Sequence, residues 1–282
     1  MNWGATGVTV RFGRRTALKE VTFHAVQGEV RCVVGGDGAG KTTLLRAIAG
    51  ALRPDAGEVV RPRAEEIGYM PASSGVYPDL SVDENLSFVA AAYGLPHEAL
   101  MERSGDLLGR MGLDRARARL GSELSGGMRQ KLGVLMAMLH RPRLLILDEP
   151  TTGVDPVSRS DLWWLIARAA AEGAAVALAT SYLDEAERAA ELLVLEGGRP
   201  VAVGTPDAIT AAMPGTLALA ERRPVGDAAL RSWRRGRTWR VWQPQGEGET
   251  PGYAIRPDLQ DAVTAAILRG DLEDAAQGGV GR

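Results

Sequence analysis

The stretch Gly35-Gly36-Asp37-Gly38-Ala39-Gly40-Lys41-Thr42-Thr43 decides the fold of this 282-residue chain. It fits the Gly-x-x-x-x-Gly-Lys-Thr phosphate loop, and it lies between an apolar run at 30–34 and a predicted helix at 42–51. A strand followed by a glycine-rich loop and a helix start binds phosphate, because the glycines let consecutive backbone N–H groups face the anion. The sequence therefore predicts a nucleotide phosphate site at residues 35–43.

Two side chains of this loop have specific expected roles. Lys41 is expected to reach the β- and γ-phosphates, and the Thr42 hydroxyl to bind Mg²⁺. The alternative is a glycine-rich turn with an incidental lysine, which the flanking strand and helix disfavour. The other predicted phosphate-binding residues are Gly35, Gly36, Asp37, Gly38, Ala39, Gly40 and Thr43.

A second motif is the run Leu144-Leu145-Ile146-Leu147-Asp148-Glu149, in which unbroken apolar residues end in two carboxylates. Such a run is typical of a strand buried on both faces in a parallel sheet. Open α/β sheets bind ligands at the carboxyl ends of their strands, so Asp148 is predicted to hold Mg²⁺ and Glu149 to polarise the attacking water. Two acids after a strand could alone be a solvated strand end, and the phosphate loop upstream disfavours that alternative.

The third motif, Leu124-Ser125-Gly126-Gly127-Met128, completes a pattern that resembles the ATP-binding subunit of ATP-binding-cassette (ABC) transporters over about residues 4–210. The resemblance implies an α/β phosphate-loop NTPase fold with a parallel sheet core, an antiparallel β subdomain and a helical signature subdomain at about 73–140. It implies ATP and Mg²⁺ as cofactors. It also implies a head-to-tail dimer, in which the serine and glycines of one subunit contact the γ-phosphate held by the other. The plainer alternative is a Ser125 helix cap with two flexible glycines.

Two further residues match the family's pattern. Phe12 occupies the position of the aromatic residue that stacks on adenine, and the alternative is an aromatic of a strand core. In Gly153-Val154-Asp155, Asp155 matches the loop that communicates across the dimer. It could equally be an acidic residue at a helix N-terminus before Pro156.

Two departures from the family's pattern bear on catalysis. Ala72 stands where the family has glutamine, and Ser181 stands where it has the histidine that contacts the γ-phosphate. Losing one preorganised donor costs about 10²–10³ in rate, so we predict intact nucleotide binding with attenuated or asymmetric hydrolysis. Ser181 remains a candidate catalytic residue through a weaker hydrogen bond, and Ser73 or Ser74 could substitute in part. Whether the chain pairs with itself or with a different cassette stays open.

Composition narrows the class of protein. The net charge of −2 predicts no strong attraction to nucleic acid. The single cysteine, Cys32, excludes a disulfide within the chain and fits a reducing cytoplasm. Neither a membrane span of about 18 apolar residues nor a signal peptide is visible in the sequence. We therefore expect a cytoplasmic protein, peripheral on the membrane, that works with a separate integral membrane permease subunit.

The chain is predicted to divide into an ABC ATP-binding domain at 1–215 and a small accessory region at 216–282. Arginine and tryptophan are interleaved in the second part, at Arg231, Arg234, Arg235, Arg237, Arg240, Trp233, Trp239 and Trp242. Such a mixture could bind nucleic acid or anionic lipid headgroups. We favour strands of a small β-rich module, with arginine stems covering apolar surface. Glycine and alanine after about residue 274 predict a frayed tail.

The elements of the predicted domain follow from hydrophobic periodicity. Strands are predicted at 6–12, 19–25, 144–147, 175–180 and 192–195, and helices at 85–93, 128–139, 158–172 and 184–190. The pattern Ser81-Val82-Asp83-Glu84 predicts a capping box at the start of the helix at 85–93. Trp163 and Trp164 are adjacent on a helix, so one is predicted to pack on the sheet and the other to lie at a margin.

The resemblance implies the ATP-binding subunit of an ABC exporter, similar to drug or polyketide efflux systems with separate membrane subunits. One alternative is a regulatory nucleotide-binding half with little turnover, which Ala72 and Ser181 favour. Another is a soluble ABC ATPase that acts on ribosomes or DNA, which is disfavoured because the chain has one cassette and no long coiled-coil insertion. The cargo cannot be identified from this sequence.

Overall fold

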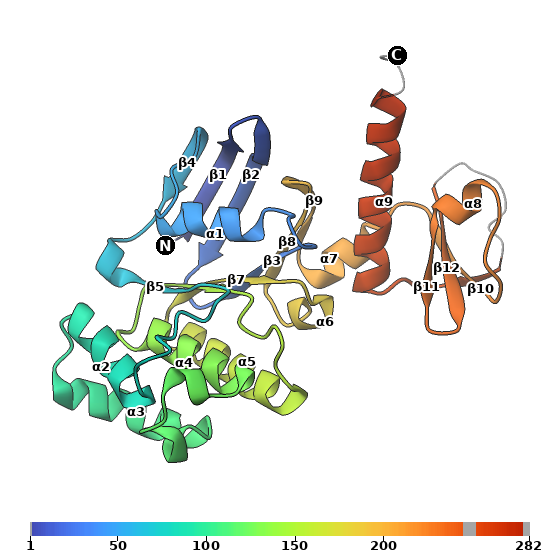
Figure 1. Cartoon of the computed structure of the whole chain (residues 1–282). Helices are drawn as coiled ribbons and strands as arrows, with labels where there is room; N and C mark the ends of the chain where they lie inside the picture. The colour runs from blue at the N-terminus through green and yellow to red at the C-terminus, as the bar shows by residue number, and fades with distance from the viewer. Residues whose placement is uncertain (1, 245–251, 279–282) are drawn as a thin grey trace.

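The computed structural model describes residues 2–244 and 252–278, which form three β-sheets with helices on both sides of the largest (Figure 1). The largest sheet has six strands in the order β5-β6-β7-β3-β8-β9. These strands are β3 (Val30–Val34), β5 (Ile67–Met70), β6 (Leu144–Asp148), β7 (Ala175–Thr180), β8 (Glu191–Glu196) and β9 (Arg199–Gly204). All pair in parallel except β9, which runs antiparallel to β8. Every residue of β6 is buried, as expected for a strand covered on both faces.

One face of this sheet is covered by α1 (Lys41–Ala49) and by an antiparallel sheet of β1 (Asn2–Phe12), β2 (Arg15–Val26) and β4 (Ala56–Val60) (Figure 1). Buried residues of α1, β1 and β2 share one apolar cluster with Ile146 of β6 and Ala177 of β7. The other face is covered by α4 (Gly126–Met138) and α5 (Pro156–Ala171), whose buried residues form a second cluster with Leu145 and Leu147. The phosphate loop thus leads from β3 of the sheet into the layer formed by α1.

A helical insertion lies below the sheet in Figure 1 and carries α2 (Val82–Ala92), α3 (His97–Arg110) and α4. Ser81 and Glu84 form the predicted capping box, in which each side chain accepts a hydrogen bond from the other residue's backbone N–H. Three short 3₁₀ turns are η1 (Ala64–Glu66), η2 (Asp114–Ala116) and η3 (Gly121–Glu123). Buried residues of α2 and α3, such as Leu86 and Leu108, belong to the same apolar cluster as α4, so the insertion is packed onto the start of the α4 layer.

The adjacent tryptophans of α5 divide as predicted. Trp163 is 5% exposed and belongs to the main core. Trp164 lies at the margin, where the guanidinium of Arg110 stands 3.8 Å from its ring centroid and that of Arg168 stands 5.5 Å away. This ring therefore joins α3 of the helical insertion to α5 of the sheet layer.

The helix predicted at 184–190 is only one turn long. The structure has α6 (Leu183–Ala186), and the chain then turns toward β8 because the Ala190 N–H donates to Val30 O of β3. A longer helix would carry residue 190 away from this sheet hydrogen bond. The single turn therefore returns the chain to the sheet directly after the predicted switch position.

The C-terminal part forms a four-stranded sheet beside a long helix (Figure 1). Its elements are α7 (Pro206–Ala211), β10 (Thr216–Ala220), α8 (Asp227–Leu230), β11 (Ser232–Arg235), β12 (Thr238–Gln243), β13 (Tyr253–Ile255) and α9 (Leu259–Gly278). The helix α9 extends through Gly278, whereas the sequence predicted fraying from about residue 274. Residues 279–282 lie outside the described residues.

Most of the arginines and tryptophans expected on strands in this part lie on β11 and β12. Trp242 is 2% exposed, and its indole Nε1 donates to Pro214 O at 2.7 Å. Arg235 and Arg240 form ion pairs with Asp261 of α9, each at 3.5 Å. These pairs tie the small sheet to α9.

The helix α9 also joins the main core. Leu259, Ala262 and Val263 belong to the cluster that contains α4 and α5, while Ala265 packs with Leu217 and Trp242 of the small sheet. One helix therefore serves both parts of the fold. Among the described residues, no helix has the length and apolar character that crossing a membrane requires.

Candidate active site

A cleft of about 570 Å³ gathers residues from four separate segments of the chain. It is lined by Phe12, Arg15, Ala17, Gly36, Asp37, Gly38, Ala39, Gly40, Lys41, Thr42, Thr43, Ala72 and Glu149. The structure therefore brings together the predicted stacking aromatic, nearly all of the phosphate loop and the predicted catalytic carboxylate. It also brings Ala72, the residue at the family's glutamine position, to the same cleft.

The phosphate loop leaves the N-terminus of α1 open toward this cleft. Gly40 is the residue that precedes the helix, with φ of 108°, and because glycine has no side chain it cannot cap the helix end. A Cβ at Gly40 would lie 2.7 Å from Leu18 Cδ2 and 2.9 Å from Ala17 O, so only glycine fits this position. The first N–H groups of a helix have no partner within it, so they can donate to an anion in the cleft.

Lys41 places a buried cation at the floor of the cleft. The residue is 6% exposed, and its Nζ donates to Gly35 O at 2.7 Å and to Ser181 Oγ at 2.9 Å. The same atom lies 3.0 Å from Glu149 Oε1. The loop lysine, the carboxylate after β6 and the serine after β7 thus form one polar group.

Four donors surround the carboxylate of Glu149. Besides Lys41 Nζ, they are Ser181 Oγ at 2.7 Å, Thr152 Oγ1 at 2.9 Å and Ser181 N at 3.2 Å. Burial raises the pKa of Glu149, but the hydrogen bonds from Ser181 and Lys41 outweigh burial and hold this pKa below its ordinary value. The group is therefore an ionised carboxylate that can accept a proton. Its backbone φ of 53° is unusual for a residue other than glycine.

The two departures from the family's pattern differ in their surroundings. Ser181 contacts both Lys41 and Glu149, so it lies within the polar group. Ala72 lines the cleft but supplies only a methyl group, which can neither donate nor accept a hydrogen bond. Neither Ser73 nor Ser74 lines the cleft, which gives no support to the idea that they substitute for the missing side chain.

Asp148 meets the chemical requirements for holding Mg²⁺. Its side chain is 0% exposed, and within the described residues neither carboxylate oxygen has a hydrogen-bond partner. Burial raises the pKa of Asp148, and the nearby Thr42 hydroxyl and the Lys41 charge partly offset that rise. Two unpaired buried oxygens beside a hydroxyl suit a hard divalent cation, which takes oxygen ligands. Thr42 and Asp148 therefore fit the metal-binding role predicted for them.

A buried carboxylate beneath the site fixes the two segments that carry Glu149 and Ser181. Glu185 is 2% exposed and accepts hydrogen bonds from Thr151 Oγ1 at 2.6 Å and Thr180 Oγ1 at 3.2 Å. Arg159 Nε lies 3.1 Å from Glu185 Oε1 and balances its charge. No sequence signal reveals this role of Glu185, because an acidic residue in a short helix gives no sign of burial.

The signature residues lie outside the cleft. Ser125 caps α4 by accepting a hydrogen bond from Met128 N at 3.3 Å. A Cβ on Gly127 would lie 3.4 Å from Ser158 Oγ, and one on Gly126 would lie 3.9 Å from Gly153 O. The start of α4 therefore borders the segment at 153–158 rather than the phosphate loop.

Asp155 belongs to the same border and serves as the cap of α5. Its carboxylate accepts from Val157 N at 3.1 Å and Ser158 N at 3.0 Å. Hydrogen bonds from Ser158 and Val157 lower the pKa of Asp155. Within one chain, the contacts of Asp155 are therefore those of an acidic residue at a helix N-terminus, which was the alternative to a role across a dimer. Ser125, Gly126, Gly127 and Asp155 form a second cluster of predicted residues, separate from the cleft.

Two residues near Glu149 and Phe12 were missed by the sequence analysis. Thr152 donates to Glu149, and no sequence signal marks a threonine three positions after a carboxylate as its partner. Arg15 lines the cleft, and the short spacing from Phe12 across a Gly-Arg turn could have revealed it.

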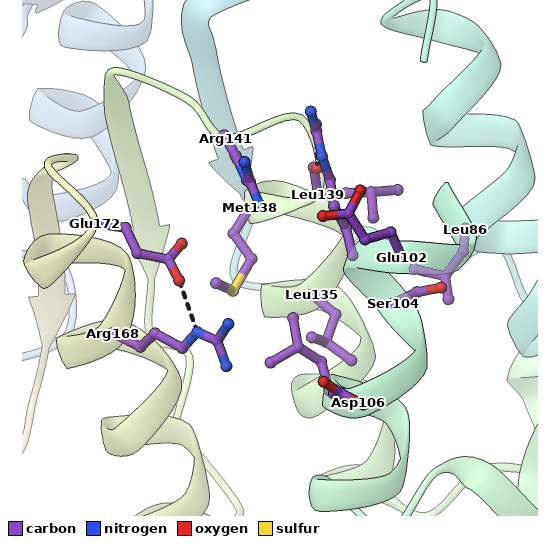
Figure 2. A pocket seen from close by; sticks show the side chains of 12 residues that line it. Leu86, Glu102, Ser104, Asp106, Leu135, Met138, Leu139, Arg141, Arg168 and Glu172 are labelled. Carbon is purple, nitrogen blue, oxygen red and sulfur yellow. Dashed lines mark hydrogen bonds and ion pairs between the residues drawn. The ribbon is translucent and has the colours of Figure 1, made fainter. Parts of the chain in front are cut away.

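A second cavity, of about 200 Å³, lies between α3, α4 and α5 and shares no lining residue with the cleft (Figure 2). Leu135 and Met138 of α4 are among its apolar lining residues. On the α5 side, Arg168 Nε and Glu172 Oε1 form an ion pair at 2.8 Å. The cavity shows that side chains pack incompletely at the boundary between the helical insertion and the sheet layer.

Sequence comparisons identify similar proteins. Residues 18–152 match the family described as ABC transporter. The probable multidrug ABC transporter ATP-binding protein YbhF of Escherichia coli (strain K12) is 41% identical over 206 residues, which are 70% of this chain and 35% of that protein. The Nod factor export ATP-binding protein I of Paraburkholderia xenovorans (strain LB400) is 36% identical over 212 residues, which are 71% of this chain and 69% of that protein. The chain therefore spans about a third of YbhF and about two thirds of the Nod factor protein.

Solved structures show the same fold. An ATP-binding subunit of an ABC transporter superposes with a TM-score of 0.69 at 30% identity, over 75% of this chain and 92% of that one. A dimeric bacterial ABC transporter cassette gives a TM-score of 0.66 at 22% identity, over 73% of this chain and 98% of that one. These likenesses confirm the predicted α/β fold.

Proposed function

The chain belongs to the ABC transporter family as an ATP-binding subunit, and from this premise we propose that it binds and hydrolyses MgATP to drive export through a separate integral membrane subunit. The observation that carries the proposal is the polar group of Lys41, Glu149 and Ser181 at the floor of the cleft, next to the unpaired Asp148. We place the protein at the cytoplasmic face of the membrane, where a permease would hold it.

Each side chain of the site has a defined part in this proposal. Lys41 and the N–H groups of α1 bind the β- and γ-phosphates. Thr42 and Asp148 hold Mg²⁺, which would neutralise charge on the phosphate oxygens. Glu149 is ionised and accepts the proton of the attacking water, and Ser181 orients that carboxylate. Phe12 stacks on the base at the mouth of the cleft.

We propose that hydrolysis is slower than in cassettes with both usual side chains. The Ala72 methyl supplies no donor to the cleft, and the Ser181 hydroxyl donates to Glu149. A missing donor to the transition-state charge typically lowers turnover by about 10²–10³. Nucleotide binding is retained in this proposal, because Lys41 and the loop amides are in place.

The position of the signature supports a head-to-tail dimer. Ser125, Gly126 and Gly127 lie outside the cleft of their own chain, yet they present a hydroxyl and the N-terminus of α4. They would complete the phosphate site of a second cassette. If the partner is a different cassette, this chain's signature serves the partner's site and its own cleft is the deviant one. If the chain pairs with itself, both sites are deviant.

The names of the relatives support export rather than import. YbhF is described as a probable multidrug transporter subunit, and the Paraburkholderia protein as a Nod factor export subunit. We propose that this chain serves an export system of that kind. The membrane subunit would select the cargo.

Steady-state MgATP hydrolysis by the purified chain and by Glu149→Gln, with bound nucleotide quantified in both, tests the proposal. We expect slow turnover in the wild type, a loss of about 10²–10⁴-fold in the variant, and equal nucleotide binding. Wild-type turnover that the variant retains would refute the assigned role of Glu149. Introducing Ala72→Gln with Ser181→His should raise turnover, and an unchanged rate would refute the idea of attenuation.

The second candidate is a regulatory half that binds ATP without turning it over, which the Ala72 methyl and Ser181 favour. Tight ATP binding with no turnover in the wild type would favour this candidate. Co-purification with an integral membrane protein is expected for both candidates, whereas salt-sensitive RNA binding would point to a soluble ABC ATPase instead.

A further inference from the structure

One cation of the nucleotide cleft has no part in the function proposed above. Arg15 lines the cleft, and its side chain is exposed. Across residues 2–244 and 252–278, Arg15 makes no hydrogen bond, ion pair or ring contact through its guanidinium. A cation that points into an anion-binding cleft without a partner is available for a ligand.

The β1–β2 hairpin places Arg15 beside the predicted stacking aromatic. Phe12 ends β1, Arg15 begins β2, and the two are directly opposed in the antiparallel register. Side chains of directly opposed residues lie on the same face of a sheet. The turn residue Arg14 does not line the cleft. The hairpin therefore presents one ring and one guanidinium to the cleft together.

The guanidinium of Arg15 also stands close to the phosphate loop. Its Nη2 lies 3.9 Å from the point that a Cβ on Gly38 would occupy. Lys41 occupies a different place, since its Nζ is bonded to Gly35 O and Ser181 at the buried end. The two cations of the cleft thus divide it into a floor and a mouth.

The cleft also contains a negative charge, which a second cation can offset. Asp37 lines the same cleft and would repel a polyphosphate. A guanidinium presents parallel N–H donors that match two phosphate oxygens, which a lysine cannot do. Arg15 can therefore offset Asp37 and bind phosphate at the side of the loop nearest to Phe12.

We propose that Arg15 binds the phosphate group closest to the base, between the ring of Phe12 and the loop at Gly38. This inference rests on the proposed function, because it takes a nucleoside polyphosphate as the ligand. It assigns Arg15 to nucleotide affinity and not to bond cleavage. ADP and ATP should therefore depend on Arg15 equally, since both carry the base-proximal phosphate.

The test is calorimetric titration of the full chain with MgATP, MgADP and adenosine, using wild type, Arg15→Gln and Arg14→Gln. Arg14 is the matched control because it is an exposed arginine one position away that does not line the cleft. We expect Arg15→Gln to weaken MgATP and MgADP by the same factor of about ten, with less loss at high salt. Adenosine binding and the thermal midpoint should not change, because Arg15 is exposed.

The inference would be overturned if Arg15→Gln and Arg14→Gln bound MgATP equally tightly. It would also be overturned if Arg15→Gln lost affinity for MgATP and kept its affinity for MgADP. An equal loss in both variants would also overturn it, because the effect would then be general charge on the hairpin. Failure of the wild type to bind any nucleotide would overturn the proposed function itself, and this inference with it. The wild-type titration therefore separates the two failures.

Discussion

The N-terminal ends of α1 and α4 present the same glycine-rich chemistry in two different settings. The end of α1 has no side-chain cap and opens into a cleft that holds a buried lysine. The end of α4 is capped by its own Ser125 and lies outside that cleft. Both ends carry a partial positive charge from the helix.

The difference shows how a phosphate site can be divided between chains. The α1 end contributes Lys41 and Thr42 to a cleft beside Asp148 and Glu149, which lie at the end of β6, so the proposed metal ligands and proton acceptor lie together within one chain. The α4 end has the Ser125 hydroxyl and backbone N–H groups and lies outside the cleft, so in the proposed dimer it would add to the phosphate site of a second chain. A change at α1 should therefore affect binding, and a change at α4 should affect turnover.

The largest expected effect comes from Lys41→Ala. Removing the buried cation should weaken MgATP binding by about 10²–10³, because a charge pair in a desolvated site contributes several kcal/mol. Equilibrium titration and a hydrolysis assay measure the change. Lys19→Ala is the control, since Lys19 is an exposed lysine on β2. Normal MgATP affinity in Lys41→Ala would place the phosphate site elsewhere in the chain.

The next effect is a loss of turnover without a loss of affinity. A Cβ on Gly127 meets only ordinary contacts within the chain, so Gly127→Ala should fold normally while blocking close approach of a phosphate to the start of α4. We expect turnover to fall by about 10², the usual cost of one lost transition-state donor. Gly109→Ala on α3, where a Cβ meets nothing within 4 Å, is the control. Unchanged turnover in Gly127→Ala would show that α4 does not contact phosphate.

A smaller effect is expected on the free energy of unfolding, and it differs between substitutions at the two helix ends. Gly40→Ala should lower the free energy of unfolding by about 1–3 kcal/mol, because alanine is strained at a φ of 108° and its Cβ meets Leu18. Ser125→Ala should cost about 1 kcal/mol, the usual loss for a removed cap. Chemical denaturation measures both. A larger loss for Ser125→Ala would reverse the ranking of the two ends.

The effect that is smallest at neutral pH concerns the segment that follows α4, where the rings of His140 and Tyr93 stack with centroids 3.7 Å apart and His140 Nε2 lies 3.2 Å from Ile67 O. Burial lowers the pKa of His140 to about 4, from an ordinary 6.5. The unfolded chain then binds more protons, so stability falls as the pH drops from about 6.5 to 4. In His140→Gln, the thermal midpoint should therefore decrease less over this pH range than in the wild type. Curves of thermal midpoint against pH that run parallel for the wild type and His140→Gln would contradict the lowered pKa of His140.

The fold of the nucleotide-binding part could be predicted from local patterns. The phosphate loop needs a strand before it and a helix after it, and both appear as predicted around Lys41. The buried strand that ends in Asp148 also has its signal in five consecutive residues. Such patterns are short, so they survive in sequence without knowledge of the tertiary structure.

The contacts of the site could not be predicted in the same way. Ser181 and Lys41 are 140 positions apart, and they meet because β7 pairs with β3. Ser181 was predicted as a weaker hydrogen-bond donor at the family's histidine position, but its two partners, Lys41 and Glu149, could not be identified from the sequence. The packing of α9 against the main core was also not predicted, because the family resemblance weakens before that helix. Pairing between distant strands and helices depends on packing that no local pattern records.

The packing of α9 against the main core determines when that core can be completed during synthesis. Leu259, Ala262 and Val263 belong to the main apolar cluster, and α9 packs mainly against α6, α7 and β9, so this side of the cluster stays exposed until residue 263 has left the ribosome. A nascent chain folds from its N-terminus, and an incomplete core exposes apolar surface to chaperones and proteases. The part of the core next to the edge strand β9 is therefore covered after the rest, and its apolar residues remain accessible to chaperones until α9 packs on them.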